Sequence, residues 1–178
     1  MTGDEILQDK HRERYVTLAL ADQITGDRWR EPLLPGGRTI HELLSHILAW
    51  DEWAIGAFEI SLLRELPASF RAALDDVDAF NGRATTRYTG LPREDILTGL
   101  QTASKRLMAS ATASGGAEWN RRKLLDLAPE PGSPRIPSVG GVLRNLTSHE
   151  ASHHQEISES FGVHVDVDSG KNGNPDQS

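Results

Sequence analysis

Apolar residues recur every three or four positions along most of this chain, which is the spacing of one face of an α-helix. Alternation with a period of two, the pattern of half-buried strands, is nearly absent. The pattern therefore predicts an all-α protein with five helical segments. These segments cover about residues 4–24, 39–66, 69–88, 92–111 and 138–161.

Local signals mark several ends of these segments. Thr39 and Glu42 have the spacing of a capping box at the start of the second segment, and Pro67 ends that segment. Pro92 opens the fourth segment at a position that helices tolerate. The stretch from Thr112 to Pro137 is rich in Gly, Ser and Pro, so it predicts a long crossover loop of the kind that often carries function.

The pattern also predicts which part of the chain packs. In the first segment the spacing gives five inward positions, namely Ile6, Leu7, Tyr15, Leu18 and Ile24. After the fifth segment, the sequence VDVDSGKNGNPDQS has almost no side chains that could form a core. We therefore expect one helical domain over residues 1–164 and a disordered tail over residues 165–178.

Composition narrows the function classes. A chain of 178 residues, 25% charged and 37% hydrophobic, can fold without disulfides or a structural metal. A net charge of -7 disfavours nucleic acid as a partner, and the absence of cysteine excludes thiol nucleophiles and Cys zinc ligands. No stretch of about 20 apolar residues occurs and the first residues lack a signal-peptide pattern. We expect a cytoplasmic protein with no membrane partner.

Two histidines of the fifth segment are the most informative residues. His149 and His153 are four positions apart and therefore share a helix face with Val142, Leu146 and Ile157. Burying two imidazoles among aliphatic side chains is costly unless each ring finds a polar partner, and a divalent cation satisfies both rings at once. Histidines bonded to neighbouring polar side chains show the same spacing, so spacing alone leaves both interpretations open.

A third ligand has to come from another segment. His46 lies on an inward face of the second segment together with Trp50 and Trp53, so we expect His46 to be that ligand and the two tryptophans to form a pocket wall. His154 turns about 100° away from His153. The remaining histidines are expected to be solvated, namely His11, His41 and His164.

The same region matches the zinc-peptidase string H-E-x-x-H over residues 149–153, with Glu150 as the general base. The longer peptidase pattern is not met, because Glu156 and Glu159 stand where Gly and His are required. A peptidase is therefore the less favoured alternative. Glu150 is kept as a candidate base or supporting residue, and Asn145 as a second supporting candidate.

Three stretches of the chain resemble the DinB-like superfamily of damage-inducible bundle proteins. They are TIHELLSHILAWDEWAIGAF, VDAFNGRATTRYTGLPREDILTGLQTASKRLMA and HEASHHQEI, and the resemblance covers about residues 4–161. It implies an up-down-down-up four-helix bundle with one additional helical segment and a long crossover. It also implies that His46, His149 and His153 bind a divalent metal, zinc or nickel, and that the protein forms a homodimer.

The resemblance leaves the activity open between two classes. Relatives of this kind include thiol-dependent S-transferases and maleylpyruvate isomerase, so we expect a metal-dependent transferase that joins a low-molecular-weight thiol to a small electrophile, or a hydrolase. The alternative is a non-catalytic, stress-related metal-binding bundle. Fold alone does not decide between them.

Overall fold

The computed structural model describes residues 2–61, 68–114 and 138–165, and these residues form helices joined by short connections. The elements are α1 (Gly3–Asp22), the short 3₁₀ helices η1 (Gly26–Arg30) and η2 (Pro35–Gly37), α2 (Ile40–Ser61), α3 (Ala68–Asp75), α4 (Val77–Tyr88), α5 (Arg93–Ala113) and α6 (Val139–Phe161). No strand occurs within the described ranges, which confirms the all-α prediction. None of the described helices is both long and apolar enough to cross a membrane.

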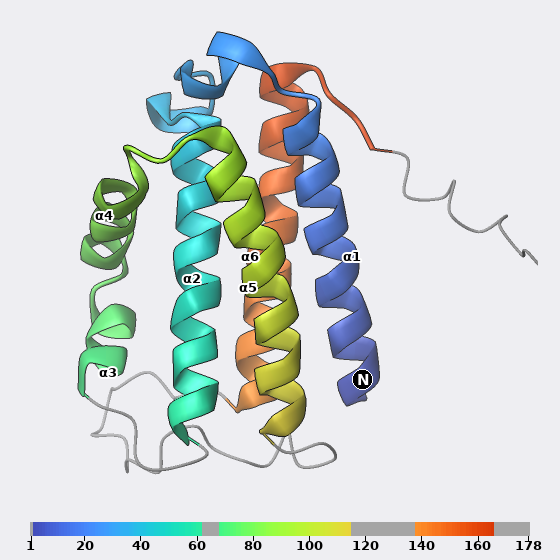
Figure 1. Cartoon of the computed structure of the whole chain (residues 1–178), viewed down its shortest axis with the longest axis vertical. Helices are drawn as coiled ribbons and strands as arrows, with labels where there is room; N and C mark the ends of the chain where they lie inside the picture. Colours follow the sequence, from blue (N-terminus) through green and yellow to red (C-terminus); the bar gives the residue numbers. More distant parts are fainter. Residues whose placement is uncertain (1, 62–67, 115–137, 166–178) are drawn as a thin grey trace, which may run out of the picture.

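Four long helices form the bundle, and they run up, down, down and up in the order α1, α2, α5 and α6 (Figure 1). The helices pack mainly in two parallel pairs, α2 along α5 and α1 along α6. The helices α3 and α4 lie outside the bundle, where α4 packs against α2. This is the bundle with an additional helical segment that the sequence predicts.

The capping signals act as expected. The Thr39 hydroxyl accepts from the backbone N–H of Glu42 at 3.1 Å, and the Glu42 carboxylate accepts from the backbone N–H of Thr39 at 2.8 Å. Ser138 caps α6, and Gly162 ends it with a φ of 67°, a left-handed conformation that favours glycine. Because the start of α2 and both ends of α6 are fixed, the histidines on these two helices have a defined register.

The pair α2 and α5 approaches closely at one glycine. A Cβ atom at Gly99 would lie 2.9 Å from Cδ2 of Leu48, closer than ordinary van der Waals contact. Leu48 is buried in the core between these helices. A side chain at position 99 would therefore force the Leu48 side chain to shift.

Some expectations are wrong. The predicted third segment is two helices, because Asp76 leaves the helical conformation and caps α4 by accepting from the backbone N–H of Ala79. Tyr15 is 61% exposed and does not face the core. Val165, assigned to the tail, packs against the core. The end of the second segment at residues 62–66, the loop at residues 115–137 and the tail at residues 166–178 lie outside the described residues.

Candidate metal centre

Three histidines from two helices meet beside the bundle core. His46 comes from α2, and His149 and His153 come from successive turns of α6. The Nε2 atoms of His46 and His149 are 3.0 Å apart, and those of His149 and His153 are 3.2 Å apart. Two nitrogens that bind one zinc ion at about 2.05 Å with tetrahedral geometry lie about 3.3 Å apart. The group can therefore hold a metal ion.

The protonation of these rings also suits a metal. Burial, together with the neighbouring charges of His149 and His153, lowers the pKa of His46 to about 4. Burial and the charge of His153 lower the pKa of His149 to about 4 as well. Both rings are therefore neutral at pH 7, the form whose lone pair binds a metal.

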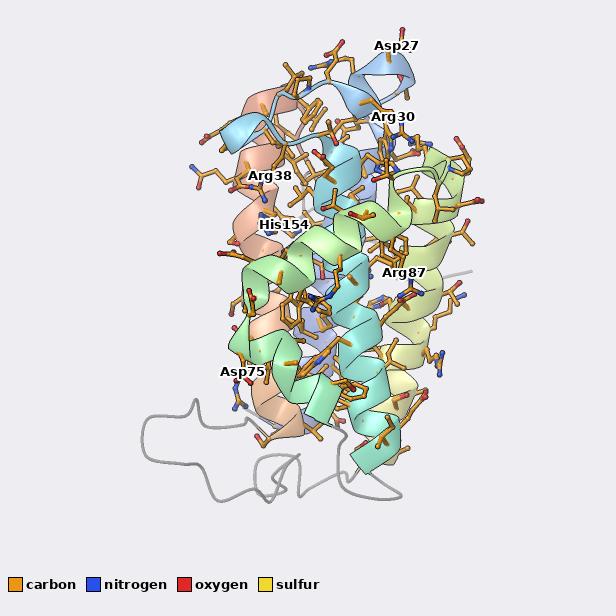
Figure 2. The ribbon with its side chains drawn as sticks, turned by 90° about the vertical axis from the view of Figure 1, so that its left-hand side faces the viewer. Asp27, Arg30, Arg38, Asp75, Arg87 and His154 are labelled. Carbon is orange, nitrogen blue, oxygen red and sulfur yellow. The ribbon has the colours of Figure 1, made fainter. Side chains whose placement is uncertain are left out.

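A carboxylate orients the third ring. Nδ1 of His153 lies 3.0 Å from Oε2 of Glu156, and because a carboxylate only accepts, Nδ1 carries the proton and donates it. The lone pair of His153 is then on Nε2, the atom that faces His149. Arg38, from the segment before α2, donates to the same Glu156 oxygen at 3.1 Å, and Figure 2 shows Arg38 beside α6. Arg38, Glu156 and His153 are thus joined by two successive hydrogen bonds. A carboxylate that accepts from the ring of a histidine commonly supports metal-bound histidines.

The helix α4 supplies a polar group on the other side of the cluster. Asn81 lies beside the His46 ring and accepts from Nε1 of Trp50 at 3.1 Å. Figure 2 shows α4 crossing in front of both α2 and α6. Sequence reasoning did not find Asn81, Glu156 or Arg38 as supporting residues. Only Glu156 had a detectable signal, because it follows His153 by three positions on the same helix.

The rings of Trp50 and Trp53 contact each other edge to face, with centroids 5.7 Å apart, but their other contacts differ. Trp50 packs on Phe80 with ring centroids 4.4 Å apart, while Trp53 lines a cavity between α2, α3 and α4. Neither Trp50 nor any of the three histidines lines that cavity. The expectation that both tryptophans form one wall beside the histidines stays a prediction.

Glu150 faces away from the histidines into a buried ionic network. Its two carboxylate oxygens accept from Arg14 at 2.7 Å, from Lys10 at 2.5 Å and from the Thr17 hydroxyl at 2.7 Å. Although burial raises the pKa of Glu150, the charges of Arg14 and Lys10 outweigh it and lower this pKa to about 2. Every one of these groups is buried. The contacts favour a structural role for Glu150 over the role of general base.

Asp51 of α2 completes the network. Arg14 donates to Oδ2 of Asp51 at 2.6 Å, and the Lys10 ammonium lies 3.2 Å from Oδ1. Two cations of α1 are thus matched by one anion from α2 and one from α6. Sequence reasoning missed this network, because charged residues on α1 and α2 are usually solvated. The available signal was that Lys10, Arg14 and Thr17 share one helix face.

The other histidines fall in three environments. His11 and His164 are exposed, as expected, but His41 is buried and its Nε2 lies 3.0 Å from the carbonyl oxygen of Leu91. The expectation that His41 is solvated is therefore wrong, because the loop that precedes α5 covers it. His154 lies apart from the cluster, with Nε2 2.9 Å from the Thr17 hydroxyl. Within residues 2–61, 68–114 and 138–165, no fourth metal-ligand side chain joins the three histidines.

Comparison with known proteins gives one match. The family model described as the DinB superfamily matches residues 10–157, which is most of the chain and includes all three histidines. No curated protein and no solved structure matches the chain.

Proposed function

The chain belongs to the DinB superfamily, and from its three converging histidines we propose that it is a divalent-metal-dependent protein acting on small molecules. The proposed metal is zinc or nickel, which imidazole nitrogens suit. The proposed reaction is transfer of a low-molecular-weight thiol to a small electrophile, with hydrolysis as the second reaction of the same centre.

The observation that carries this proposal is the convergence of three imidazole rings from α2 and α6. Three protein ligands leave a coordination position for water or a substrate atom, which is the pattern of catalytic zinc sites. A bound metal would supply Lewis acidity, which lowers the pKa of a coordinated water or thiol. Since the chain has no cysteine, the thiol of the proposed transfer would come from the substrate, and water would be the nucleophile of hydrolysis.

The residues around the cluster would hold the ligands in place. Glu156 accepts from Nδ1 of His153, and Arg38 donates to Glu156 and so helps to orient it. Asn81 lies beside the His46 ring on the side of α4.

The first test is metal content. Protein purified without an affinity tag should contain about one zinc or nickel ion per chain by elemental analysis, and the variants His46→Ala and His149→Ala should each lose it. His154→Gln is the matched control, because His154 lies on the same helix outside the cluster and should keep the metal. Absence of metal from the parent protein after reconstitution would overturn the proposal.

The second test is activity. Metal-loaded protein should accelerate the reaction of a low-molecular-weight thiol, such as mycothiol or bacillithiol, with 1-chloro-2,4-dinitrobenzene, and chelation should abolish the acceleration. Hydrolysis of 4-nitrophenyl acetate tests the second reaction in the same samples. A metal-loaded protein inactive in both assays would instead support a non-catalytic metal-binding bundle.

A further inference from the structure

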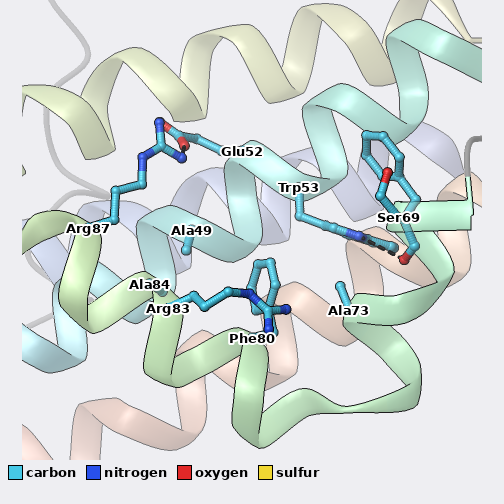
Figure 3. A pocket seen from close by; sticks show the side chains of 10 residues that line it. Ala49, Glu52, Trp53, Ser69, Ala73, Phe80, Arg83, Ala84 and Arg87 are labelled. Atoms are coloured by element: carbon cyan, nitrogen blue, oxygen red, sulfur yellow. Dashed lines mark hydrogen bonds and ion pairs between the residues drawn. The ribbon is translucent and has the colours of Figure 1, made fainter.

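A cavity of about 460 Å³ lies between α2, α3 and α4, and Figure 3 shows the side chains around it. Its size falls in the range of small-molecule sites, about 300–1,000 Å³. Three aromatic side chains and three alanines supply its apolar surface, namely Trp53, Phe70, Phe80, Ala49, Ala73 and Ala84. The flat aromatic surfaces and small side chains favour a flat apolar ligand.

The charged side chains that line the cavity differ in whether they already have a partner. Arg87 donates to Oε2 of Glu52 at 2.8 Å, and the Tyr88 hydroxyl donates to the same oxygen at 2.7 Å, so the Glu52 carboxylate is already engaged. Arg83 also lines the cavity, and among the described residues it has no hydrogen bond or ion pair. Figure 3 shows the Arg83 side chain extending toward α3, while the Arg87 guanidinium meets Glu52.

The formal charge of the described side chains that line the cavity is therefore positive. Arg87 and Glu52 cancel each other, and Arg83 adds one positive charge in a chain whose net charge is -7. A free guanidinium beside an apolar surface is suited to a carboxylate, because its N–H groups match two carboxylate oxygens. One free positive charge favours a monoanion over a dianion, which would also be repelled by Glu52.

We propose that this cavity binds a small apolar carboxylate, with the apolar body against Trp53 and Phe80 and the carboxylate on Arg83. The proposal goes beyond the metal centre, because none of the three histidines lines the cavity and no metal is needed for binding. The ligand would nevertheless contact Phe80, which precedes Asn81 on α4, so it binds to the helix that supports His46.

The experiment is a titration of ¹⁵N-labelled full-length protein with 2-naphthoate, in the presence of EDTA, followed by NMR. The indole N–H signal of Trp53 is the reporter, because this group lines the cavity and donates to the carbonyl oxygen of Phe70. We expect saturable shifts of this signal and of residues on α3 and α4. The uncharged analogue 2-naphthamide should bind at least about tenfold more weakly, since it lacks the charge-assisted hydrogen bonds.

Variants assign the contacts. Arg83→Gln should weaken 2-naphthoate binding about tenfold and leave 2-naphthamide binding unchanged, because only the charge is removed. Ala84→Leu should weaken both compounds by filling the cavity. Arg12→Gln is the matched control, an exposed arginine on α1 outside the cavity, and should bind like the parent protein.

Two outcomes would overturn the proposal. One is equal binding of the acid and the amide, and the other is an Arg83→Gln variant that binds 2-naphthoate as tightly as the parent. Because EDTA is present throughout, failure of this proposal is distinguishable from failure of the metal proposal, which elemental analysis tests separately.

Discussion

The helix α6 carries two polar clusters, both buried or half-buried, and only one of them is built from paired charges. On one face, Glu150 meets Lys10 and Arg14 of α1 in a network where each charge has an opposite partner. On another face, His149 and His153 meet His46 in a cluster of three ring nitrogens, and Glu156 bonds His153 at its edge. The first cluster pairs its charges without a ligand, and the second brings three ring nitrogens close enough to share one.

This difference separates stability from function within a single helix. A paired buried network satisfies its own groups, and removing one member leaves an uncompensated charge. Converging acceptors gain from an added cation, so their natural partner is a metal ion. Both clusters fix α6 against its neighbours, but only the second can respond to an added ligand.

The largest effect should follow from opening the ionic network. Glu150→Gln keeps the shape of the side chain but leaves Lys10 and Arg14 with Asp51 as the only anion of the network. We expect a loss of about 3–5 kcal/mol in the free energy of unfolding. For a chain of this size the thermal midpoint should fall by roughly 10 °C, measured by circular dichroism in EDTA.

Glu159→Gln provides the control for this comparison. Glu159 lies on the same helix and is exposed, with a hydrogen bond from Gln155. Its substitution should change the free energy of unfolding by less than about 0.5 kcal/mol. Similar midpoints for the two variants would contradict the assignment of the network as a stabilising element.

The next effect should come from completing the histidine cluster. Zinc at about 100 times its dissociation constant should raise the free energy of unfolding by about 2.7 kcal/mol, because it binds the folded chain. His149→Ala should remove this gain while changing the stability of the chelated protein little. A zinc-dependent gain that survives in His149→Ala would place the metal elsewhere.

The sequence predicted the histidine cluster better than the ionic network. Helix periodicity alone places His149 and His153 on one face, and the apolar neighbours of His46 place it inward, so three residues could be named without knowing the packing. The network depends on contacts between residues 140 positions apart, Lys10 and Glu150. Their charges predict solvent exposure unless the partner is known, so their burial was missed.

The helix boundaries also show that local sequence signals predict some features of the structure and miss others. Capping residues and prolines predicted the start of α2, α5 and α6, because these signals act within a few positions of each other. The break between α3 and α4 at Asp76 was missed, since apolar periodicity continues across it. Periodicity reports which residues are helical, and it reports poorly where one helix ends and the next begins in a new direction.

A smaller effect should come from changing Glu156, which supports the histidine cluster through its hydrogen bond with His153. Glu156→Gln keeps an acceptor near His153 but removes the charge that binds Arg38. We expect zinc affinity to fall about tenfold, measured by competition with a chromophoric chelator. Glu159→Gln should keep the affinity of the parent protein, and an equal loss in both variants would indicate a general effect of charge on α6.

The most discriminating effect should appear in the pH dependence of stability, where the two clusters titrate in different windows. In the metal-free protein, burial lowers the pKa of His46 and of His149 from 6.5 to about 4. The unfolded chain therefore binds more protons between these values, so stability present above pH 6.5 is lost as the pH falls toward 4.

The pKa of Glu150 is lowered from 4.5 to about 2, since the charges of Arg14 and Lys10 outweigh the effect of burial. The stability that this carboxylate contributes is present above pH 4.5 and is lost as the pH falls toward 2. Urea unfolding of the chelated protein between pH 7 and 3 should show both losses. A His46→Gln and His149→Gln double variant should lack most of the upper one, and Glu150→Gln should lack most of the lower one. If either substitution changed the slope in the other window, the two clusters would titrate as one unit, and the separation of stability from ligand binding along α6 would fail.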